Sequence, residues 1–316
     1  MLMPMAQTWF TSTGAVLPKS ASRGSKGVLP IIAAGCAILF LSQGVVGQDY
    51  MKQATIVTTE ASLEISANSP RPLAQVIDAL QQAYGWEINY EDAQYRSVPD
   101  YKEVPAPQYF ATKAGTKIRV PSGGNFSVTV PVRSISDASP DEQTTLQAIV
   151  DAYNQSENPG RFELRKDLKG NFDLVGISAR DGRSTVAIHP LLDTEITIPK
   201  KQRTLLEVVD LVCSTLSLKS HSEVSLGVYP RTILLATPTT GGASKVPARQ
   251  LLAEVLSSAS RGIRWQLLYD PEGQDYFLNL STVANKPPVR KATAQTTTAE
   301  GGGTTTIVQS SPSIKK

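Results

Sequence analysis

The chain has few of the residues that most often carry nucleophilic or metal chemistry. Its 316 residues include only two histidines, His189 and His221, and two cysteines. A zinc site or a nucleophile–base pair needs several such groups that converge on one point. His221 opens the stretch HSE, which lacks the HExxH spacing of a helical zinc site. We therefore predict no metal, no cofactor and no enzymatic activity.

The scarcity of cysteine also excludes a disulfide framework. Cys36 lies in the apolar N-terminal run, so Cys213 is the one cysteine in the rest of the chain. Cys213 follows Val209 and Leu205 at helical spacing, which places it on the apolar face of a predicted helix. We interpret Cys213 as a buried small hydrophobic residue rather than as a reactive thiol.

A concentrated basic region is missing from the body of the chain. The whole sequence has 31 basic and 28 acidic residues, but three of the basic residues lie in 1–47 and five lie in 284–316. Residues 48–283 hold 23 basic and 27 acidic residues, so this part is net acidic. Binding to nucleic acid requires a concentrated positive surface. We therefore predict no nucleic-acid partner.

The apolar run at 28–47 stands out because of its position. It follows a segment, 1–27, that carries three basic residues and no acid, and it ends in small residues just before Gln48. These are the parts of a secretory signal. We predict that residues 1–47 are a signal peptide and that the mature protein is periplasmic or extracellular. The alternative is an uncleaved membrane anchor through 28–47, because this run approaches the length that spans a bilayer.

Residues 73–92, LAQVIDALQQAYGWEINYED, combine a helical pattern with a strand pattern. The apolar positions of the first part recur at the spacing of one helix face: Leu73, Val76, Ile77 and Leu80. Gly85 is typical of a helix end. The stretch WEINY (86–90) then alternates large and polar residues, as a half-buried strand does.

The same arrangement returns three more times. Helical spacing of apolar residues recurs in 146–153, 205–212 and 248–255. Strand-like runs follow these helices: PGRFELRKD (159–167), NFDLVGI (171–177), EVSLGVY (223–229), TILLAT (232–237) and WQLLYDPEGQDYFLNL (265–280). The stretches LKGN (168–171) and DPEG (270–273) are turn signals between paired strands. Other apolar runs precede several helices: SLEIS (62–66), FSVTVPV (126–132) and TEITIP (194–199).

These patterns predict an α+β fold of tandem small β-α-β-β modules, each a helix packed on a short mixed sheet. One such module buries its apolar surface poorly, so neighbouring modules are expected to share a core or to stack. The predicted modules are 48–97, 136–190, 191–240 and 241–283. A proline-rich connector with a strand pair around PSGGN (121–125) occupies 98–135, and a disordered tail rich in Thr, Ser, Gly and Lys occupies 284–316.

The first module has a distinctive order of elements within SLEISANSPRPLAQVIDALQQAYGWEINYED (62–92): a strand, a leucine-spaced helix, a glycine and a strand that ends in Tyr-acid. The residues of this pattern are Pro72, Leu73, Ala74, Leu80, Gly85 and Tyr90. The stretch resembles the short N-terminal domain that secretins and TonB-dependent signalling receptors share. This resemblance implies a small interaction domain of the cell envelope, with secretion or TonB-system proteins as partners. It does not imply a pore, because 316 residues leave no room for a secretin pore or a receptor barrel.

Four aromatic residues are the candidate contact sites for a partner or ligand. The stretch WQLLYD (265–270) mirrors WEINYED (86–92), so Trp86 and Trp265 occupy matching positions. The matching tyrosines are Tyr90 and Tyr269. Both tryptophans open a strand that should face a helix, and a role in the core is therefore favoured over a contact role.

Two pairs of carboxylates are candidates for acid–base chemistry. Glu91 and Asp92 end one predicted strand, and Asp270 and Glu272 end another. Acids are common in the turns that follow strands. We interpret both pairs as turn residues.

The leading functional prediction is a non-enzymatic, exported envelope protein that binds or organises partner proteins. Strand addition at exposed sheet edges would form the contacts. One alternative is a module that binds peptidoglycan or another glycan through its tryptophans. Another is an envelope hydrolase of unrecognised type that uses His189 or His221 beside an acid. A membrane contact is expected only if the N-terminal segment stays uncleaved.

Overall fold

The computed structural model describes residues 54–59, 61–68, 70–95, 97–105, 117–131, 140–167, 169–181 and 184–283. All of them belong to one unit that begins at Val45. The predicted signal or anchor and the predicted tail lie outside the described residues. Helices and mixed sheets alternate along the chain, which confirms the α+β prediction.

The centre of the structure is a seven-stranded mixed sheet. Its strand order is β12 (Val224–Leu226), β16 (Asp275–Thr282), β15 (Ile263–Asp270), β3 (Ile88–Glu91), β8 (Phe172–Asp181) and β7 (Arg161–Lys166), and β9 (Ser184–Ala187) pairs with the far part of β8. β3 runs parallel to both of its neighbours, β8 and β15. The pairs β7/β8 and β15/β16 are antiparallel, and β12 is parallel to β16.

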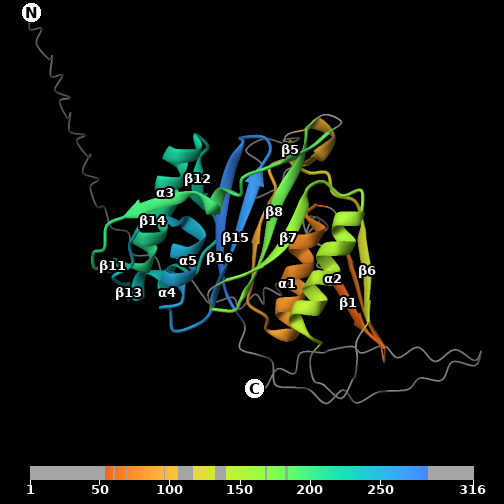
Figure 1. Cartoon of the computed structure of the whole chain (residues 1–316), viewed down its shortest axis with the longest axis horizontal. Coiled ribbons are helices and arrows are strands. Elements are labelled where there is room, and N and C mark those ends of the chain that lie inside the picture. Colours follow the sequence, from red (N-terminus) through yellow and green to blue (C-terminus); the bar gives the residue numbers. More distant parts are fainter. Residues whose placement is uncertain are drawn as a thin grey trace, which may run out of the picture. The chain divides into compact units, whose positions relative to one another are not determined.

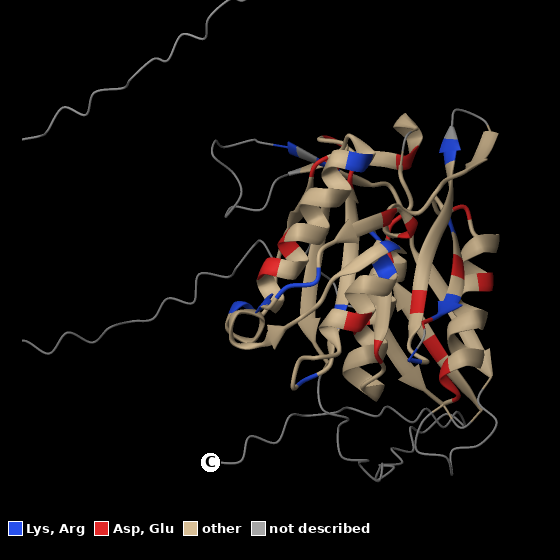
Figure 2. Cartoon of the chain, turned by 60° about the vertical axis from the view of Figure 1, so that its left-hand side comes forward, with Lys and Arg blue, Asp and Glu red and all other residues tan. Residues whose placement is uncertain are grey.

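Helices cover both faces of this sheet (Figure 1). α1 (Pro72–Tyr84) and α2 (Glu142–Gln155) lie on one face, and α3 (Leu205–Ser220) and α5 (Ala248–Leu256) lie on the other. The apolar positions that predicted these helices are buried in all four. Gly85 ends α1 in a left-handed conformation, with φ of 71°, which glycine adopts without strain. Figure 2 shows acidic and basic residues interspersed over these elements rather than gathered on one side.

A second, smaller sheet lies against the outer side of α1 and α2 (Figure 1). It consists of three antiparallel strands: β1 (Thr55–Thr58), β2 (Ser62–Ala67) and β6 (Phe126–Pro131). The remaining strands form three short pairs: β4 (Tyr101–Pro105) with β5 (Lys117–Pro121), β10 (Glu195–Ile198) with β14 (Ala243–Pro247), and β11 (Arg203–Thr204) with β13 (Pro238–Thr239). Two single turns of 3₁₀-helix, η2 (Val98–Asp100) and η3 (Leu191–Asp193), complete the list, together with the short α4 (Arg231–Ala236).

The four predicted segments contribute strands to one common sheet. β3 comes from the first, β7 and β8 from the second, β12 from the third, and β15 and β16 from the fourth. The segments therefore share a core, and they do not close four separate sheets. The buried apolar side chains form one continuous cluster that runs through all of them.

Two local predictions were wrong. The run TILLAT (232–237) was predicted as a strand, but residues 231–236 form α4, which begins after Pro230 and buries Leu234 beside α3. Proline at the start of a helix costs no hydrogen bond, and a short apolar run carries no periodicity that separates helix from strand. The strands on either side of PSGGN, β5 and β6, do not pair with each other. β5 pairs with β4, and β6 pairs with β2.

The first part of the predicted connector (98–135) is extended in part, but it is also paired. Within its described residues, Val98–Asp100 form η2 and Tyr101–Pro105 form β4. Among the described helices of the whole structure, none combines the length and the apolar character needed to cross a bilayer.

Candidate functional site

The four aromatic candidates lie in the hydrophobic core. Trp86 is 7% exposed and Trp265 is 1% exposed, and Tyr90 and Tyr269 are also buried. Trp86 stacks on Tyr84 with 5.0 Å between the ring centroids. A stacking platform for a sugar needs an exposed ring face, so this burial favours the structural role of all four residues.

The side chains of Tyr90 and Tyr269 lie on opposite faces of the central sheet, although their sequence stretches match. β3 and β15 are parallel, and their register sets Tyr90 beside Gln266. Side chains alternate between the two faces along a strand. Tyr269, three residues after Gln266, therefore projects to the face opposite Tyr90. The likeness in sequence does not correspond to an equivalent place in the sheet.

Asp92 organises a closed polar cluster on the α1 face. It accepts hydrogen bonds from the Arg71 guanidinium at 2.7 Å, from the Tyr90 hydroxyl at 2.6 Å and from the Tyr95 hydroxyl at 3.2 Å. It also accepts one from the backbone N–H of Tyr269 at 3.1 Å. Burial, together with the nearby Asp92 carboxylate, raises the pKa of both Tyr90 and Tyr95 well above the usual range. Asp92 lies directly after the end of β3, where the sequence predicted an acid after a strand, but it is buried and serves as a structural carboxylate.

Arg249 of α5 organises a second cluster, on the opposite face. Its guanidinium pairs with Glu91 of β3, with Asp173 of β8 at 3.3 Å and with Asp193 of η3 at 3.0 Å. It also lies 5.3 Å from the centre of the Trp265 ring. Glu91 is the last residue of β3, as predicted, but it belongs to the strand and is buried in the middle of the sheet, so its interpretation as a turn residue was wrong. By contrast, Asp270 caps the β15–β16 turn by accepting from the Glu272 N–H, as predicted.

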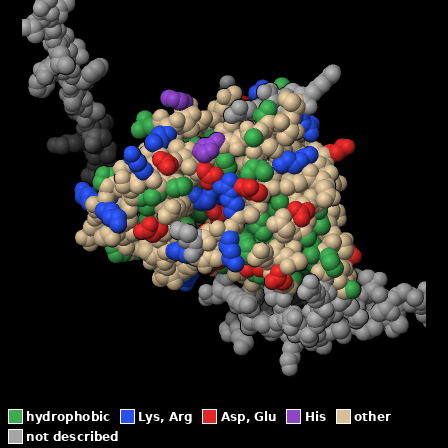
Figure 3. All heavy atoms as spheres, in the orientation of Figure 1, with side chains coloured by type: hydrophobic (Ala, Val, Ile, Leu, Met, Phe, Trp, Pro, Cys, Tyr) green, Lys and Arg blue, Asp and Glu red, His purple; other side chains and the backbone are tan. Residues whose placement is uncertain are grey.

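The Arg249 cluster brings three carboxylates together with two guanidinium groups, those of Arg249 and Arg165. Burial raises the pKa of Glu91 and of Asp173, and Arg249 offsets only part of that rise. Burial alone would also raise the pKa of Asp193, but hydrogen bonds from Arg165 and Arg249 lower it. Figure 3 shows basic and acidic side chains adjoining one another near the middle of the view. Among the described residues, no group of three or more His, Cys, Asp or Glu side chains is placed so that it could hold a metal ion. This arrangement suits a structural ion network better than a reactive centre.

The histidines and Cys213 are not brought together. His189 and His221 are both exposed, and His221 ends α3 in a left-handed conformation. Within the described part of the chain, neither histidine has a side-chain hydrogen bond or ion pair. Cys213 is buried, and burial raises the pKa of its thiol to about 12. A thiol with this pKa is protonated at neutral pH, which agrees with its predicted role as a small hydrophobic residue.

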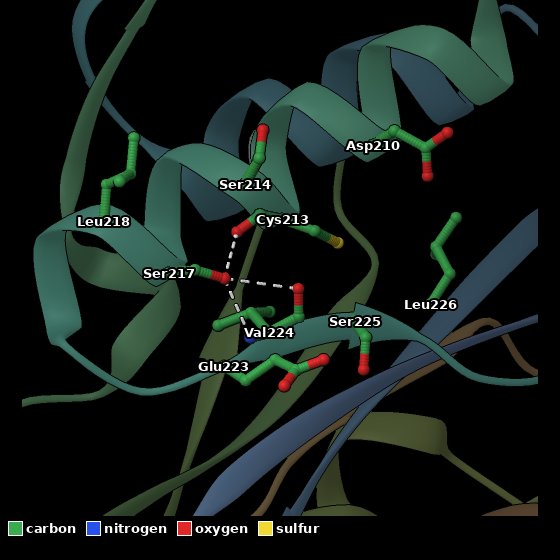
Figure 4. Close-up of a pocket in the computed structure, with 9 residues that line it drawn as sticks. All are labelled: Asp210, Cys213, Ser214, Ser217, Leu218, Glu223, Val224, Ser225 and Leu226. Atoms are coloured by element: carbon green, nitrogen blue, oxygen red, sulfur yellow. Dashed lines mark hydrogen bonds between the residues drawn. The ribbon is translucent and has the colours of Figure 1, made fainter. Parts of the chain in front are cut away.

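A groove lies between α3 and β12, at one edge of the central sheet (Figure 4). It has a volume of about 540 Å³. Its lining residues come from one face of α3 and from the edge strand: Asp210, Cys213, Ser214, Ser217, Leu218, Glu223, Val224, Ser225 and Leu226. The lining includes two carboxylates and no basic residue.

Two strongly exposed apolar side chains lie close to this edge in the sequence. Leu218, on the rim of the groove, is 79% exposed, and Val228, just after β12, is 77% exposed. Leu211 of α3 and Phe277 of β16 are also exposed. Phe277 pairs with Ser225 in the sheet register. Its side chain therefore lies on the face of the sheet opposite to the side chains of Val224 and Leu226. Apolar side chains that gather on a surface mark sites of interaction more often than scattered ones do.

Sequence reasoning did not find this groove as a site. EVSLGVY was predicted as a strand, and Cys213 was predicted on the buried face of a helix, but nothing in the sequence said that β12 would be an edge. Comparisons of the chain with family models, with curated proteins and with solved structures found no match.

Proposed function

We propose that the protein is an exported, non-enzymatic interaction module of the cell envelope. It binds an extended segment of a partner protein in the groove between α3 and β12. The partner class follows from the resemblance of residues 62–92 to the N-terminal domains of secretins and TonB-dependent receptors. The single observation that carries the binding role is the set of exposed apolar residues around the β12 edge.

The position of the groove supports an extended partner. β12 pairs with β16 on one side only, so its other side is a sheet edge that an added strand can use. Leu218 and Leu226 offer apolar contacts beside that edge. Burying a leucine side chain contributes about 1.5–3 kcal/mol, and the hydrogen bonds of an added strand must supply the rest of the free energy that offsets the entropy cost of association.

A labelled heptapeptide, Lys-Val-Thr-Val-Thr-Val-Lys, tests this proposal. Its fluorescence anisotropy is measured as full-length protein is added. We expect saturable binding, because the valines fit the apolar rim and the lysines complement the carboxylates. Leu218→Glu should weaken binding by at least about tenfold, since it removes an apolar contact from the rim.

Leu235→Glu is the matched control. Leu235 is exposed as well, at 46%, but it lies on α4 and does not line the groove. This variant should bind the peptide like the wild-type protein. Equal losses in both variants, or no saturable binding by the wild-type protein, would overturn the proposal.

A further inference from the structure

We propose that Ser217 is a latch on the β12 edge, and that a partner strand with apolar centre and basic ends displaces it to pair with Val224 and Leu226. This inference rests on the proposed function, because it specifies how the same groove is occupied. It names the backbone groups that the partner uses and the chemistry of the partner segment.

The sheet register shows which backbone groups of β12 face outward. The Tyr276 N–H donates to the Glu223 carbonyl at 2.8 Å, and the Gly227 N–H donates to the Leu278 carbonyl at 3.0 Å. In a parallel pair, alternate residues of a strand bond to the neighbour. Between Glu223 and Gly227, the residues that stand opposite Tyr276 and Leu278 in the register are Val224 and Leu226. Their N–H and C=O groups therefore point to the open edge.

The Ser217 hydroxyl bonds to the outward-facing backbone groups of Val224. Its Oγ accepts from the Val224 N–H at 2.8 Å and lies 3.3 Å from the Val224 carbonyl oxygen, to which it can donate (Figure 4). A single hydroxyl thus takes the place that the backbone of a further strand would take. Short edge strands whose polar groups are covered resist unwanted pairing. No bond of this kind covers Leu226 within the described residues.

Displacement of this hydroxyl leaves no polar group stranded. Ser217 Oγ is also 3.0 Å from the Cys213 carbonyl oxygen, one turn earlier in α3. Serine hydroxyls commonly bond to that carbonyl within a helix. When a partner strand takes over Val224, the hydroxyl keeps Cys213 as its acceptor. The exchange of hydrogen bonds is nearly balanced, so the apolar and ionic contacts of the partner decide the outcome.

Charge placement in the groove defines the ends of the partner segment. Asp210 lies beside the Leu226 end of β12, and Glu223 lies at its start (Figure 4). A strand that follows β12 past both carboxylates would gain an ion pair at each end if it carried lysine or arginine there. The apolar residues between these ends would face Leu218 and Leu226.

Ser217→Ala tests the latch with the same heptapeptide. Removal of the competing hydroxyl should tighten binding by about two- to tenfold, the value of one ordinary net hydrogen bond. Ser217→Thr keeps the hydroxyl and should bind like the wild-type protein. Ser257→Ala is the matched control, because the Ser257 hydroxyl likewise donates to a carbonyl three residues earlier, that of Glu254, and Ser257 does not line the groove.

Two further measurements report on the backbone directly. Amide hydrogen exchange at Val224 should be slow in the wild-type protein and faster in Ser217→Ala, and peptide should restore its protection. Peptides that are N-methylated at every second residue, in either alternation, should differ. One of the two should lose at least about tenfold in affinity, because its N–H groups face β12.

The outcomes separate the two proposals. If the peptide binds the wild-type protein but Ser217→Ala changes neither affinity nor exchange at Val224, the latch is wrong and the proposed function stands. If both N-methylated peptides bind as well as the parent, strand pairing is wrong in the same way. If no form of the protein binds the peptide, the proposed function fails with it.

Discussion

At each edge of the central sheet, a polar side chain from a helix bonds to the backbone N–H and C=O of one residue in the edge strand, and the side chain differs between the two edges. At one end, the Asn154 amide of α2 bonds to both backbone groups of Phe162 in β7, donating to its carbonyl at 2.7 Å and accepting from its N–H at 2.9 Å. At the other end, the Ser217 hydroxyl of α3 does the same for Val224 in β12, at 3.3 and 2.8 Å. In both cases a helix that precedes the edge strand caps it.

The chemistry of the two caps gives the edges different properties. An amide has a separate donor and acceptor, so Asn154 makes two independent bonds and loses both when a strand displaces it. The hydroxyl of Ser217 has one hydrogen to share and a second acceptor on its own helix. The β7 edge is therefore expected to stay shut, and the β12 edge is the one that opens.

Charged contacts reinforce the difference. Arg165 of β7 bonds to Asp193 at 2.6 Å, and Asp193 bonds in turn to Arg249, which reaches Glu91 in the middle of the sheet. This chain of ion pairs ties the β7 end to α5 and β3. Among the described residues around β12, the surroundings are apolar side chains with two unneutralised carboxylates on the groove.

The largest expected effect comes from breaking that ion chain. Arg249→Met leaves Glu91 and Asp173 buried with no counter-ion, and loss of one partner from a buried pair typically costs about 3–5 kcal/mol. Urea unfolding should show this loss in the free energy of unfolding. Replacement of the exposed Arg261 by methionine is the control, and it should change stability little.

The pH dependence of Arg249→Met identifies the cause. Burial already raises the pKa of Glu91 and Asp173 in the folded protein, and loss of Arg249 should raise it further. A carboxyl whose pKa is raised by folding favours the folded state when it is protonated. The loss of stability should therefore shrink as the pH falls. A loss that is the same at every pH would point to altered packing instead of buried charge.

Removal of the β7 cap should have the next largest effect. Asn154→Ala strands the N–H and C=O of Phe162, and we expect a loss of about 1–3 kcal/mol in the free energy of unfolding. Ser217→Ala should cost less, about 0.5–1.5 kcal/mol, because fewer independent bonds are lost. Gln147→Ala, on the exposed side of α2, serves as the control. Equal losses of stability in Asn154→Ala and Ser217→Ala would contradict the proposed difference in strength between the two edge caps.

The helices could be predicted from the sequence because their signals are local. Leu146 and Val150 in α2, and Leu205 and Val209 in α3, follow the spacing of one helix face, and all are buried. Strand pairing could not be predicted in the same way. Ile88 of β3 pairs with Phe172 of β8, and such contacts between distant segments depend on how the whole core packs. The sharing of one sheet by all four segments is a consequence of these distant pairings.

The polar residues of the site left a weaker signal. Glu91 looked like a turn residue because its partner, Arg249, lies far away in the sequence. The two capping residues, however, are polar residues at positions where the helix pattern predicts an apolar one. Asn154 and Ser217 each continue a row of apolar residues at four-residue spacing, the first after Leu146 and Val150 and the second after Val209 and Cys213. A small polar residue on an apolar row indicates a polar partner on the facing strand, although it does not indicate that the strand is an edge.

The smallest expected effect concerns the open edge and its charge. Partial burial raises the pKa of Asp210 above that of an ordinary aspartate, so it begins to take up a proton at a higher pH than an exposed aspartate does. Protonation removes its attraction for a lysine of the heptapeptide, and an exposed ion pair contributes about 0.2–1 kcal/mol. Peptide affinity should therefore fall by about two- to fivefold between about pH 7 and about pH 4. Asp210→Asn should flatten this dependence, and a peptide with glutamine in place of lysine should show none with either protein. If Asp210→Asn kept the full pH dependence, the carboxylate at the Leu226 end would not contact the partner, and the basic ends assigned to the partner strand would have to be reduced to the one beside Glu223.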